Sequence, residues 1–408
     1  MTFSELNFEP ELMEGLNSMG FTKPTPIQQL AIPIILDNRD IIACAQTGTG
    51  KTAAFLLPVI NKIIKAHKNS VNTLIIVPTR ELAIQIDEAM QGFGYFTPVT
   101  AIAIYGGNDG ISFEQEKKAL TQGANIIIAT PGRLISHLNM GYVKFNEIEH
   151  LILDEADRML DMGFSDDLNK IISFLPKTRQ TLMFSATMAP KIRDLAKKIL
   201  NNPEQINIAV SKPAAGVLQQ AYLAFSTQKM ALLKGILLSK KELASILIFS
   251  STKDKVKELE RELLRAKFNI AAIHSDLEQD QRTEVLRQFK SKNLQVLVAT
   301  DILSRGIDID SIGLVINYDV PRDAEDYIHR VGRTARAETT GVALTFINPE
   351  DMRKFKNIED LIGDVIPKVA LPTELGDGPP YDPNKKFDRP HSGHKGGGKG
   401  KPFFKKKK

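Results

Sequence analysis

The chain is built from short, nearly continuous apolar segments that alternate with longer amphipathic stretches. In the first half these segments are residues 41–42, 74–77, 101–104, 126–128, 151–153 and 182–184. A strand that is apolar at every position is buried on both faces, which is typical of parallel sheets covered by helices. The stretches between the segments carry apolar residues at helical spacing. This alternation predicts a doubly wound α/β domain with a parallel sheet.

The second half of the chain repeats this plan. Its strand candidates are residues 246–249, 270–273, 296–298, 314–316 and 342–344. Residues 201–216 contain turn-forming residues and few apolar clusters, so we expect a domain boundary there. We assign residues 1–206 to the first domain, 207–217 to a linker and 218–367 to the second domain.

Residues 368–408 differ in composition from the two domains, because Pro, Gly and Lys dominate them. Such a segment cannot bury enough apolar surface to order itself, and it is predicted to be a disordered basic tail. Residues 385–408 hold ten Lys or Arg and one acid, which leaves residues 1–384 with a net charge of −4. The two domains could therefore bind a polyanion only through local basic patches.

Composition excludes several classes of protein. Hydrophobic residues make up 42% of the chain and charged residues 25%, as in globular proteins with a large core. No apolar run is long enough to cross a bilayer, and the first residues do not resemble a signal peptide. Cys44 is the only cysteine, which excludes an intramolecular disulfide and a multi-cysteine metal site. We expect a cytoplasmic protein.

A glycine-rich segment follows the first predicted strand and has the composition of a phosphate-binding loop. It comprises Ala45, Gln46, Thr47, Gly48, Thr49, Gly50, Lys51 and Thr52. Glycines let backbone N–H groups approach phosphate oxygens, and the next helix would present its positive N-terminal end. Lys51 would neutralise the outer phosphates, and the Thr52 hydroxyl could be a ligand of Mg²⁺. The alternative is a glycine-rich turn without a chemical role, since Ala45 replaces the first glycine of the general pattern.

Three carboxylates, Asp154, Glu155 and Asp157, directly follow the apolar segment 151–153. Alone they could form an acidic surface turn, but carboxylates placed near a core require a cation. Together with the phosphate loop they predict a nucleotide triphosphate site. Asp154 would hold Mg²⁺, and Glu155 would orient or deprotonate the water that attacks the γ-phosphate.

A phosphoryl-transfer site also requires positive charge where the transition state becomes negative. Arg333 and Arg336 lie three residues apart in a basic segment of the second domain, so on a helix they would face the same side. We interpret them as completing the site when the two domains close. The alternative is a solvated basic helix face.

The order of these motifs resembles that of the DEAD-box ATP-dependent RNA helicases of superfamily two, over roughly residues 1–367. The family is named after the tetrapeptide found here at 154–157. Residues 1–29 resemble its adenine-recognition motif, with Phe21, Lys23 and Gln28 as the matching residues. The resemblance implies two RecA-like domains, ATP and Mg²⁺ as cofactors, and selectivity for ATP through the Gln28 amide.

The resemblance also implies roles for residues that are weak signals on their own. Gly306 and Asp308 would meet ATP from the second domain, and Arg333 and Arg336 would be arginine fingers. The residues that couple hydrolysis to strand separation would be Asp157, Ser185, Thr187, His329 and Arg330, with the Ser185 and Thr187 hydroxyls bonded to the acidic motif. The RNA-binding residues would be Pro78, Thr79, Arg80, Gly107, Thr130, Arg133, Gln279, Arg282 and Thr300. Such groups suit contacts with phosphates and sugars of any sequence.

The resemblance thus implies an enzyme that hydrolyses ATP on RNA and locally separates short duplexes or remodels ribonucleoproteins. It would act as a monomer, with ribosomal or RNA-decay proteins as partners. Residues 301–305 and the tail are most similar to the bacterial RhlE-type branch, with Ser275 and Ser304 as small departures from the family. The tail is interpreted either as a tether for RNA or as a solubilising end. Two alternatives are a DNA helicase or translocase, and an RNA chaperone that anneals strands without ATP.

Overall fold

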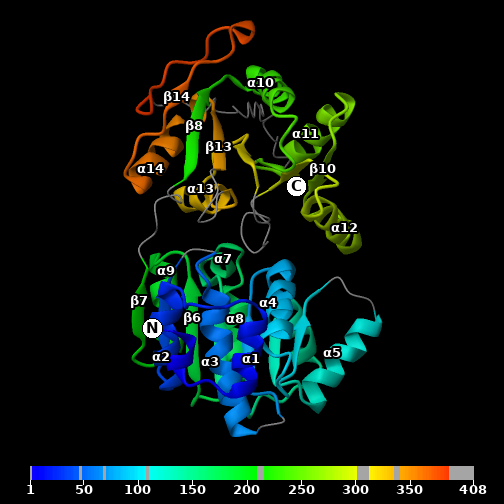
Figure 1. Ribbon diagram of the computed structural model, residues 1–408, viewed down its shortest axis with the longest axis vertical. Helices are drawn as coiled ribbons and strands as arrows, with labels where there is room; N and C mark the ends of the chain where they lie inside the picture. Colours follow the sequence, from blue (N-terminus) through cyan, green and yellow to red (C-terminus); the bar gives the residue numbers. More distant parts are fainter. Residues whose placement is uncertain are drawn as a thin grey trace, which may run out of the picture.

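The computed structural model describes residues 2–45, 48–67, 70–106, 110–208, 216–300, 312–334 and 341–385. These residues form two α/β lobes, one above the other in Figure 1, and each lobe contains a seven-stranded sheet. The fold class predicted from the apolar segments is confirmed. Within the described ranges, no helix is long and apolar enough to cross a membrane.

The first lobe, the lower one in Figure 1, is built on a sheet with the order β3-β4-β2-β5-β6-β1-β7. Its strands are β1 (Ile41–Cys44), β2 (Thr73–Ile76), β3 (Ala101–Ile104), β4 (Ile126–Ala129), β5 (His150–Leu153), β6 (Gln180–Ser185) and β7 (Glu204–Asn207). All pairs are parallel, so the strands end at the same edge of the sheet. Because β6 pairs with both β1 and β5, the loops after these three strands leave that edge side by side.

Helices cover both faces of this sheet. They are η1 (Phe3–Leu6), α1 (Pro10–Ser18), α2 (Pro26–Leu36), α3 (Lys51–Ala66), α4 (Arg80–Phe93), α5 (Gly110–Gln122), α6 (Pro131–Asn139), α7 (Ala156–Asp161), α8 (Ser165–Ser173) and α9 (Pro190–Ile199). Ile75 and Ile152 pack into one core, whereas their neighbours Leu74 and Leu151 pack into the other. These strands are apolar at every position because each side chain is buried on whichever face it lies.

The second lobe has the same plan, with the strand order β10-β11-β9-β12-β13-β8-β14. Its strands are β8 (Val217–Leu223), β9 (Ile246–Phe249), β10 (Ile270–Ile273), β11 (Val296–Ala299), β12 (Leu314–Asn317), β13 (Gly341–Ile347) and β14 (Lys368–Val369). Its helices are α10 (Ser226–Ser239), α11 (Lys253–Arg265), α12 (Gln279–Lys290), α13 (Ala324–Val331), η2 (Pro349–Asp351), α14 (Met352–Ile362) and η3 (Thr373–Leu375). Figure 1 shows α12 at the side of this lobe that faces the first lobe.

Three strands, β7, β8 and β14, have no counterpart among the predicted segments. They lie at or next to the edges of their sheets, where half-exposed positions carry polar residues. Their sequences therefore lack the continuous apolar character that marks the central strands. Pairing with a neighbour, rather than composition, makes them strands.

The expectation that a disordered tail begins at residue 368 is corrected by the structure. Lys368 and Val369 pair with β8, and the Gln228 side chain donates hydrogen bonds to the carbonyls of Leu375 (2.8 Å) and Asp377 (3.1 Å). Residues 368–385 thus pack against the second lobe. Backbone pairing, helix contacts and the packing of Leu371, Leu375 and Tyr381 against the cores of the lobe hold this segment. Residues 386–408 lie outside the described part of the chain.

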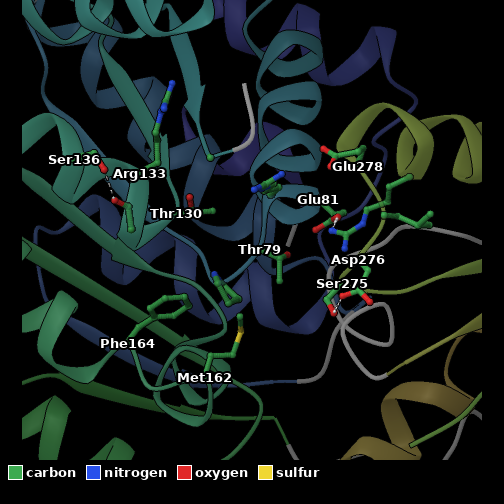
Figure 2. A pocket seen from close by; sticks show the side chains of 16 residues that line it. Thr79, Glu81, Thr130, Arg133, Ser136, Met162, Phe164, Ser275, Asp276 and Glu278 are labelled. Carbon is green, nitrogen blue, oxygen red and sulfur yellow. Dashed lines mark hydrogen bonds and ion pairs between the residues drawn. The ribbon is translucent and has the colours of Figure 1, made fainter. Parts of the chain in front are cut away.

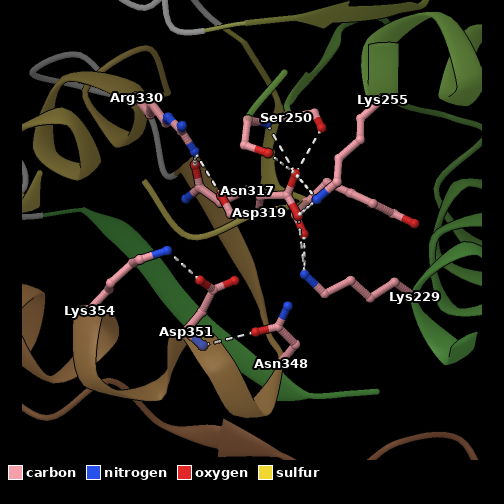
Figure 3. A network of polar contacts seen from close by, with 11 residues as sticks. Lys229, Ser250, Lys255, Asn317, Asp319, Arg330, Asn348, Asp351 and Lys354 are labelled. Carbon is pink, nitrogen blue, oxygen red and sulfur yellow. Dashed lines mark hydrogen bonds and ion pairs between the residues drawn. The ribbon is translucent and has the colours of Figure 1, made fainter. Parts of the chain in front are cut away.

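A buried polar network holds the second lobe together beyond the end of β12 (Figure 3). Asp319 accepts hydrogen bonds from the Ser250 hydroxyl (2.9 Å), the Ser251 amide (3.0 Å) and Lys255 (3.0 Å). Buried Lys229 lies 3.4 Å from the same carboxylate and donates to the Tyr318 carbonyl at 2.7 Å. Burial raises the pKa of Asp319, but the two lysines and the Ser251 amide outweigh burial and hold this pKa below its ordinary value. Burial lowers the pKa of Lys229, although Asp319 opposes this shift.

We expect Asp319→Asn to lower the free energy of unfolding of the second lobe by about 3–5 kcal/mol at neutral pH, because Lys229 would remain buried beside a neutral partner. Hydrogen exchange of the β9 and β12 amides in urea measures this lobe separately from the first. Because the folded pKa of Asp319 is depressed, its contribution is present above the unfolded value of about 4 and is lost as the pH falls below it. The difference between the two proteins should therefore shrink in acid.

The matched control is Asp360→Asn. Asp360 also pairs with a lysine, Lys356 at 2.8 Å, but both side chains are exposed. Its substitution should leave hydrogen exchange in the second lobe almost unchanged, since exposed pairs contribute little. Equal destabilisation by the two substitutions would contradict the importance given to burial of Asp319.

Candidate functional site

The phosphate loop connects β1 to α3, and its geometry requires glycine. Gly48 and Gly50 have positive φ values of 80° and 92°, which side chains rarely adopt. A Cβ atom at Gly50 would also lie 2.5 Å from Gln28 Nε2. Buried Lys51 opens α3 and donates a hydrogen bond to the carbonyl of Ala45, 2.9 Å away. Gln46 and Thr47 lie outside the described residues.

The predicted adenine-recognition residues have different environments. Gln28, on α2, is only 1% exposed; its Oε1 accepts from the Thr25 amide at 2.9 Å, and its Nε2 donates to the Gly50 carbonyl at 3.1 Å. Phe21 packs edge-on against Phe93, whereas Lys23 is exposed. The Gln28 side chain therefore ties the start of α2 to the phosphate loop, a contact that the sequence did not predict.

The acidic motif lies beyond β5, at the edge where the phosphate loop follows β1. Asp154, Glu155 and Asp157 are all buried, and Asp154 accepts a hydrogen bond from the Glu155 amide at 2.9 Å. Burial raises the pKa of Asp154, and the nearby Lys51 ammonium opposes this shift. Glu155 has a φ of 49°, a strained value for a residue other than glycine, and such strain is concentrated at functional sites.

The donor set at this edge suits Mg²⁺. Mg²⁺ is usually bound by one or two carboxylates together with substrate phosphates, rather than by a cage of protein ligands. Buried Asp154 supplies a carboxylate, and half-buried Thr52 supplies a hydroxyl from the first turn of α3. In the part of the chain that the structure describes, no three His, Cys, Asp or Glu side chains form a metal cage.

The predicted coupling motif at 185–187 meets the acidic motif through its backbone. The amide of Ala186 donates to Asp157 Oδ2 at 3.2 Å. The Ser185 hydroxyl instead donates to the carbonyl of Thr187 at 2.8 Å. The end of β6 directs the Ala186 N–H toward α7, a contact that the hydroxyl-bearing residues of the motif did not predict.

The basic segment of the second lobe is divided between its interior and its surface. Arg330 is fully buried on α13, where it donates to Asn317 (3.1 Å) and to the Asp319 carbonyl (2.9 Å), as Figure 3 shows. His329 is also buried, whereas Arg333 is partly exposed in the turn after α13. Arg330 is therefore part of the network that holds the lobe. Gly306, Asp308 and Arg336 lie outside the described residues.

A pocket of about 850 Å³ is formed jointly by the two lobes (Figure 2). Predicted RNA-binding residues that line it are Pro78, Thr79, Arg80, Thr130, Arg133 and Arg282. Thr300, which the structure describes, is not among the lining residues, while Gly107 and the Gln279 side chain are outside the described part. Figure 2 shows Thr130 and Arg133 on one side of the pocket and Ser275, Asp276 and Glu278 on the other.

Several residues that line this pocket were not predicted from the sequence. Met162 and Phe164 come from the turn between α7 and α8, and Leu277 precedes α12. They are apolar residues without a motif, so no local signal marks them. Only the folded arrangement brings them beside the predicted polar groups.

A partly buried ion pair joins the two lobes across the pocket. Arg282 Nη1, on α12, lies 2.6 Å from Oε1 of Glu81, in the first turn of α4, and the side chains are 12% and 9% exposed. Arg282 Nη2 also donates to the His274 carbonyl at 3.3 Å. A predicted RNA-binding arginine is thus oriented by a carboxylate from the opposite lobe.

Solved structures share this two-lobed architecture. S. cerevisiae Dbp5 bound to RNA and ADP BeF3 matches with a TM-score of 0.82 and 32% identity, over 90% of this chain and 95% of that chain. Mss116p bound to ssRNA and AMP-PNP matches with a TM-score of 0.80 and 29% identity, over 91% of this chain and 80% of that chain.

We expect Gln28→Glu to raise the KM for ATP about tenfold, the equivalent of losing one hydrogen bond. A carboxylate has no N–H to donate to the Gly50 carbonyl, so the phosphate loop would lose its tie to α2. Gln29→Glu is the control, because exposed Gln29 donates to the Pro24 carbonyl (2.9 Å) away from the loop. Steady-state ATP hydrolysis measures both variants, and equal KM values for Gln28→Glu and the unsubstituted chain would contradict this role.

Comparison with known sequences identifies the family. Residues 25–195 match the DEAD/DEAH box helicase family, and residues 228–338 match the helicase conserved C-terminal domain. The chain is 40% identical to the DEAD-box ATP-dependent RNA helicase CshA of Geobacillus kaustophilus, over 91% of this chain and 79% of the relative. The Bacillus subtilis CshA is also 40% identical, over 91% and 75%. These relatives do not support the expected RhlE-type branch. The chain belongs to the DEAD-box ATP-dependent RNA helicase family.

Proposed function

We propose that the chain hydrolyses ATP between its lobes and uses this cycle to separate short RNA duplexes locally. The observation that carries this proposal is the pocket shared by both lobes, which gathers six of the predicted RNA-binding residues around the Glu81–Arg282 pair. Solved relatives of the same architecture are bound to RNA. A groove assembled from two lobes lets closure of the lobes change the grip on RNA.

In this proposal the edge of the first sheet carries out hydrolysis. Lys51 contacts the outer phosphates, and the N-terminus of α3 supplies further positive potential. Asp154 and Thr52 would hold Mg²⁺, which would neutralise phosphate charge. Glu155 orients the attacking water and accepts its proton. The strained backbone of Glu155 supports this role, because such strain is concentrated at functional sites.

Coupling between hydrolysis and RNA follows two paths in this proposal. Within the first lobe, the Ala186 amide links the acidic motif to β6 through Asp157. Across the lobes, Arg333 stabilises charge on the transferring phosphoryl group when the second lobe closes. Buried Arg330 and Asp319 support the position of the helix that precedes Arg333.

We expect Glu155→Gln to retain binding of ATP and RNA but to slow RNA-stimulated hydrolysis about a hundredfold or more, because the amide cannot accept the proton. Phosphate release measures hydrolysis, and fluorescence anisotropy of a labelled RNA measures binding. Strand separation of a short RNA duplex should fall in parallel.

Arg333→Ala tests the contribution of the second lobe in the same assays. Hydrolysis should fall while binding of ATP to the first lobe is retained. Normal turnover in Glu155→Gln would remove Glu155 from the proposed role. Normal turnover in Arg333→Ala would instead contradict a site shared between the lobes.

The pocket is proposed to bind the sugar-phosphate backbone of RNA rather than the bases. Thr79 and Thr130 offer hydroxyls, and Arg80 and Arg282 offer guanidinium groups that suit phosphates. Glu278, on the opposite wall, would repel phosphates and so limit the path of the strand, whereas Asp276 is neutralised by Lys253 (2.9 Å) and Lys257 (2.7 Å).

We expect Arg282→Ala to raise the RNA concentration for half-maximal ATPase activity about tenfold, the loss of one charge-assisted hydrogen bond. Closure of the lobes on addition of RNA and an ATP analogue, followed by fluorescence transfer between labels on the two lobes, should also become less complete. Both effects follow because Arg282 contacts Glu81 and lines the groove.

Arg287→Ala provides the matched control on the same helix. Arg287 is exposed and pairs within α12 with Glu284 at 2.8 Å. Arg287→Ala should leave the RNA concentration for half-maximal ATPase activity and the closure of the lobes almost unchanged. Equal effects of the two substitutions would show that general charge on α12, rather than the interlobe contact, governs RNA binding.

A further inference from the structure

A cluster of buried side chains lies behind Arg133, on the first-lobe side of the pocket. Glu116, on α5, is 2% exposed, and His137, on α6, is fully buried. Arg133 and His137 are four residues apart on α6 and therefore lie on one face of that helix. None of these contacts is required by the chemistry of ATP hydrolysis.

One oxygen of Glu116 joins the two α6 side chains. Glu116 Oε2 accepts a hydrogen bond from Arg133 Nε at 2.8 Å and lies 2.7 Å from His137 Nε2. The other ring nitrogen of His137 is bonded to the hydroxyl of Tyr142. The carboxylate is thereby held in place, because His137 and Tyr142 are themselves packed in the lobe.

An aromatic ring constrains the face of the same guanidinium. The Phe113 ring centroid lies 4.8 Å from Arg133 Cζ, and the ring stacks on His137 at 4.4 Å with an interplanar angle of 14°. Attraction between a cation and a ring holds the guanidinium over the ring. Glu116 thus restrains Arg133 through its Nε, and Phe113 restrains it from the side of the ring.

One donor of Arg133 is left for a ligand. Its Nη2 is buried and has no hydrogen-bond partner among the described residues, although the Arg133 side chain lines the pocket. A buried N–H without an acceptor is costly unless a ligand supplies one. A phosphate oxygen is the acceptor that a planar guanidinium binds well.

We propose that Glu116 is a positioning residue, which holds Arg133 so that its Nη2 donates to a phosphate oxygen of the RNA strand. This inference rests on the proposed RNA groove. Glu116 is too buried to contact RNA itself, and Arg133 neutralises its charge. The pair therefore offers a directed hydrogen bond to RNA with little additional long-range attraction.

The test is the RNA concentration for half-maximal ATPase activity in four variants of the full chain. Arg133→Ala should raise this concentration about tenfold, and Glu116→Ala should raise it by a similar factor. The double variant should be no weaker than Arg133→Ala, because Glu116 acts only through Arg133. Glu116→Gln should restore RNA binding to within about twofold, because its amide oxygen still accepts from Arg133 Nε.

Phe113→Leu is the second test, in case Glu116→Ala does not fold. This substitution removes the ring but keeps the Glu116 carboxylate. It should raise the RNA concentration for half-maximal ATPase activity about threefold without changing ATPase activity in the absence of RNA. An unchanged RNA requirement in folded Glu116→Ala, or an additive loss in the double variant, would overturn the inference. An unchanged RNA concentration for half-maximal activity in Arg133→Ala would instead overturn the RNA-binding role of Arg133, and this outcome is distinct from a failure of the role proposed for Glu116.

Discussion

The order of three neighbouring strands, β1, β6 and β5, is the constraint on which the candidate ATP site depends. Because these strands are parallel and paired, the phosphate loop, the acidic motif and the segment at 185–187 leave the sheet at one edge. Asp154 is buried at this edge, so burial raises its pKa while the Lys51 ammonium opposes the shift. The same burial that stabilises the sheet therefore creates the need for a cation.

Three arginines that the sequence places in the candidate site are held by polar partners. Arg282 is oriented by Glu81 across the lobes, Arg133 by Glu116 within the first lobe, and Arg330 by the carbonyl of Asp319 in the second. A long side chain loses rotamer freedom when it binds a ligand. An arginine that a fixed partner already holds has lost this freedom before the ligand binds. The lobes thus present arginines whose directions are already set.

Local chemistry made part of the site predictable. The central strands were marked by continuous apolar residues, and Lys51 and Asp154 by motifs with a physical mechanism. The predicted start of the tail is wrong, because residues 368–385 pair with β8, contact Gln228 and pack Leu371, Leu375 and Tyr381 against the second lobe, and isolated apolar residues form no periodic pattern. The bond from Ala186 to Asp157 was missed for a related reason, since a backbone amide carries no signal in the sequence.

Two parallel-sheet lobes and the motifs of an ATP-dependent RNA helicase could be predicted from the sequence, because hydrophobic periodicity and glycine-rich loops are local properties. Which charges meet depends instead on how the helices pack. Glu81 faces Arg282, and Glu116 lies behind Arg133, because helices distant in the chain pack at these points. Exposed and buried carboxylates are identical in sequence. Their consequences differ because the energy of a charge depends on the water and partners that surround it.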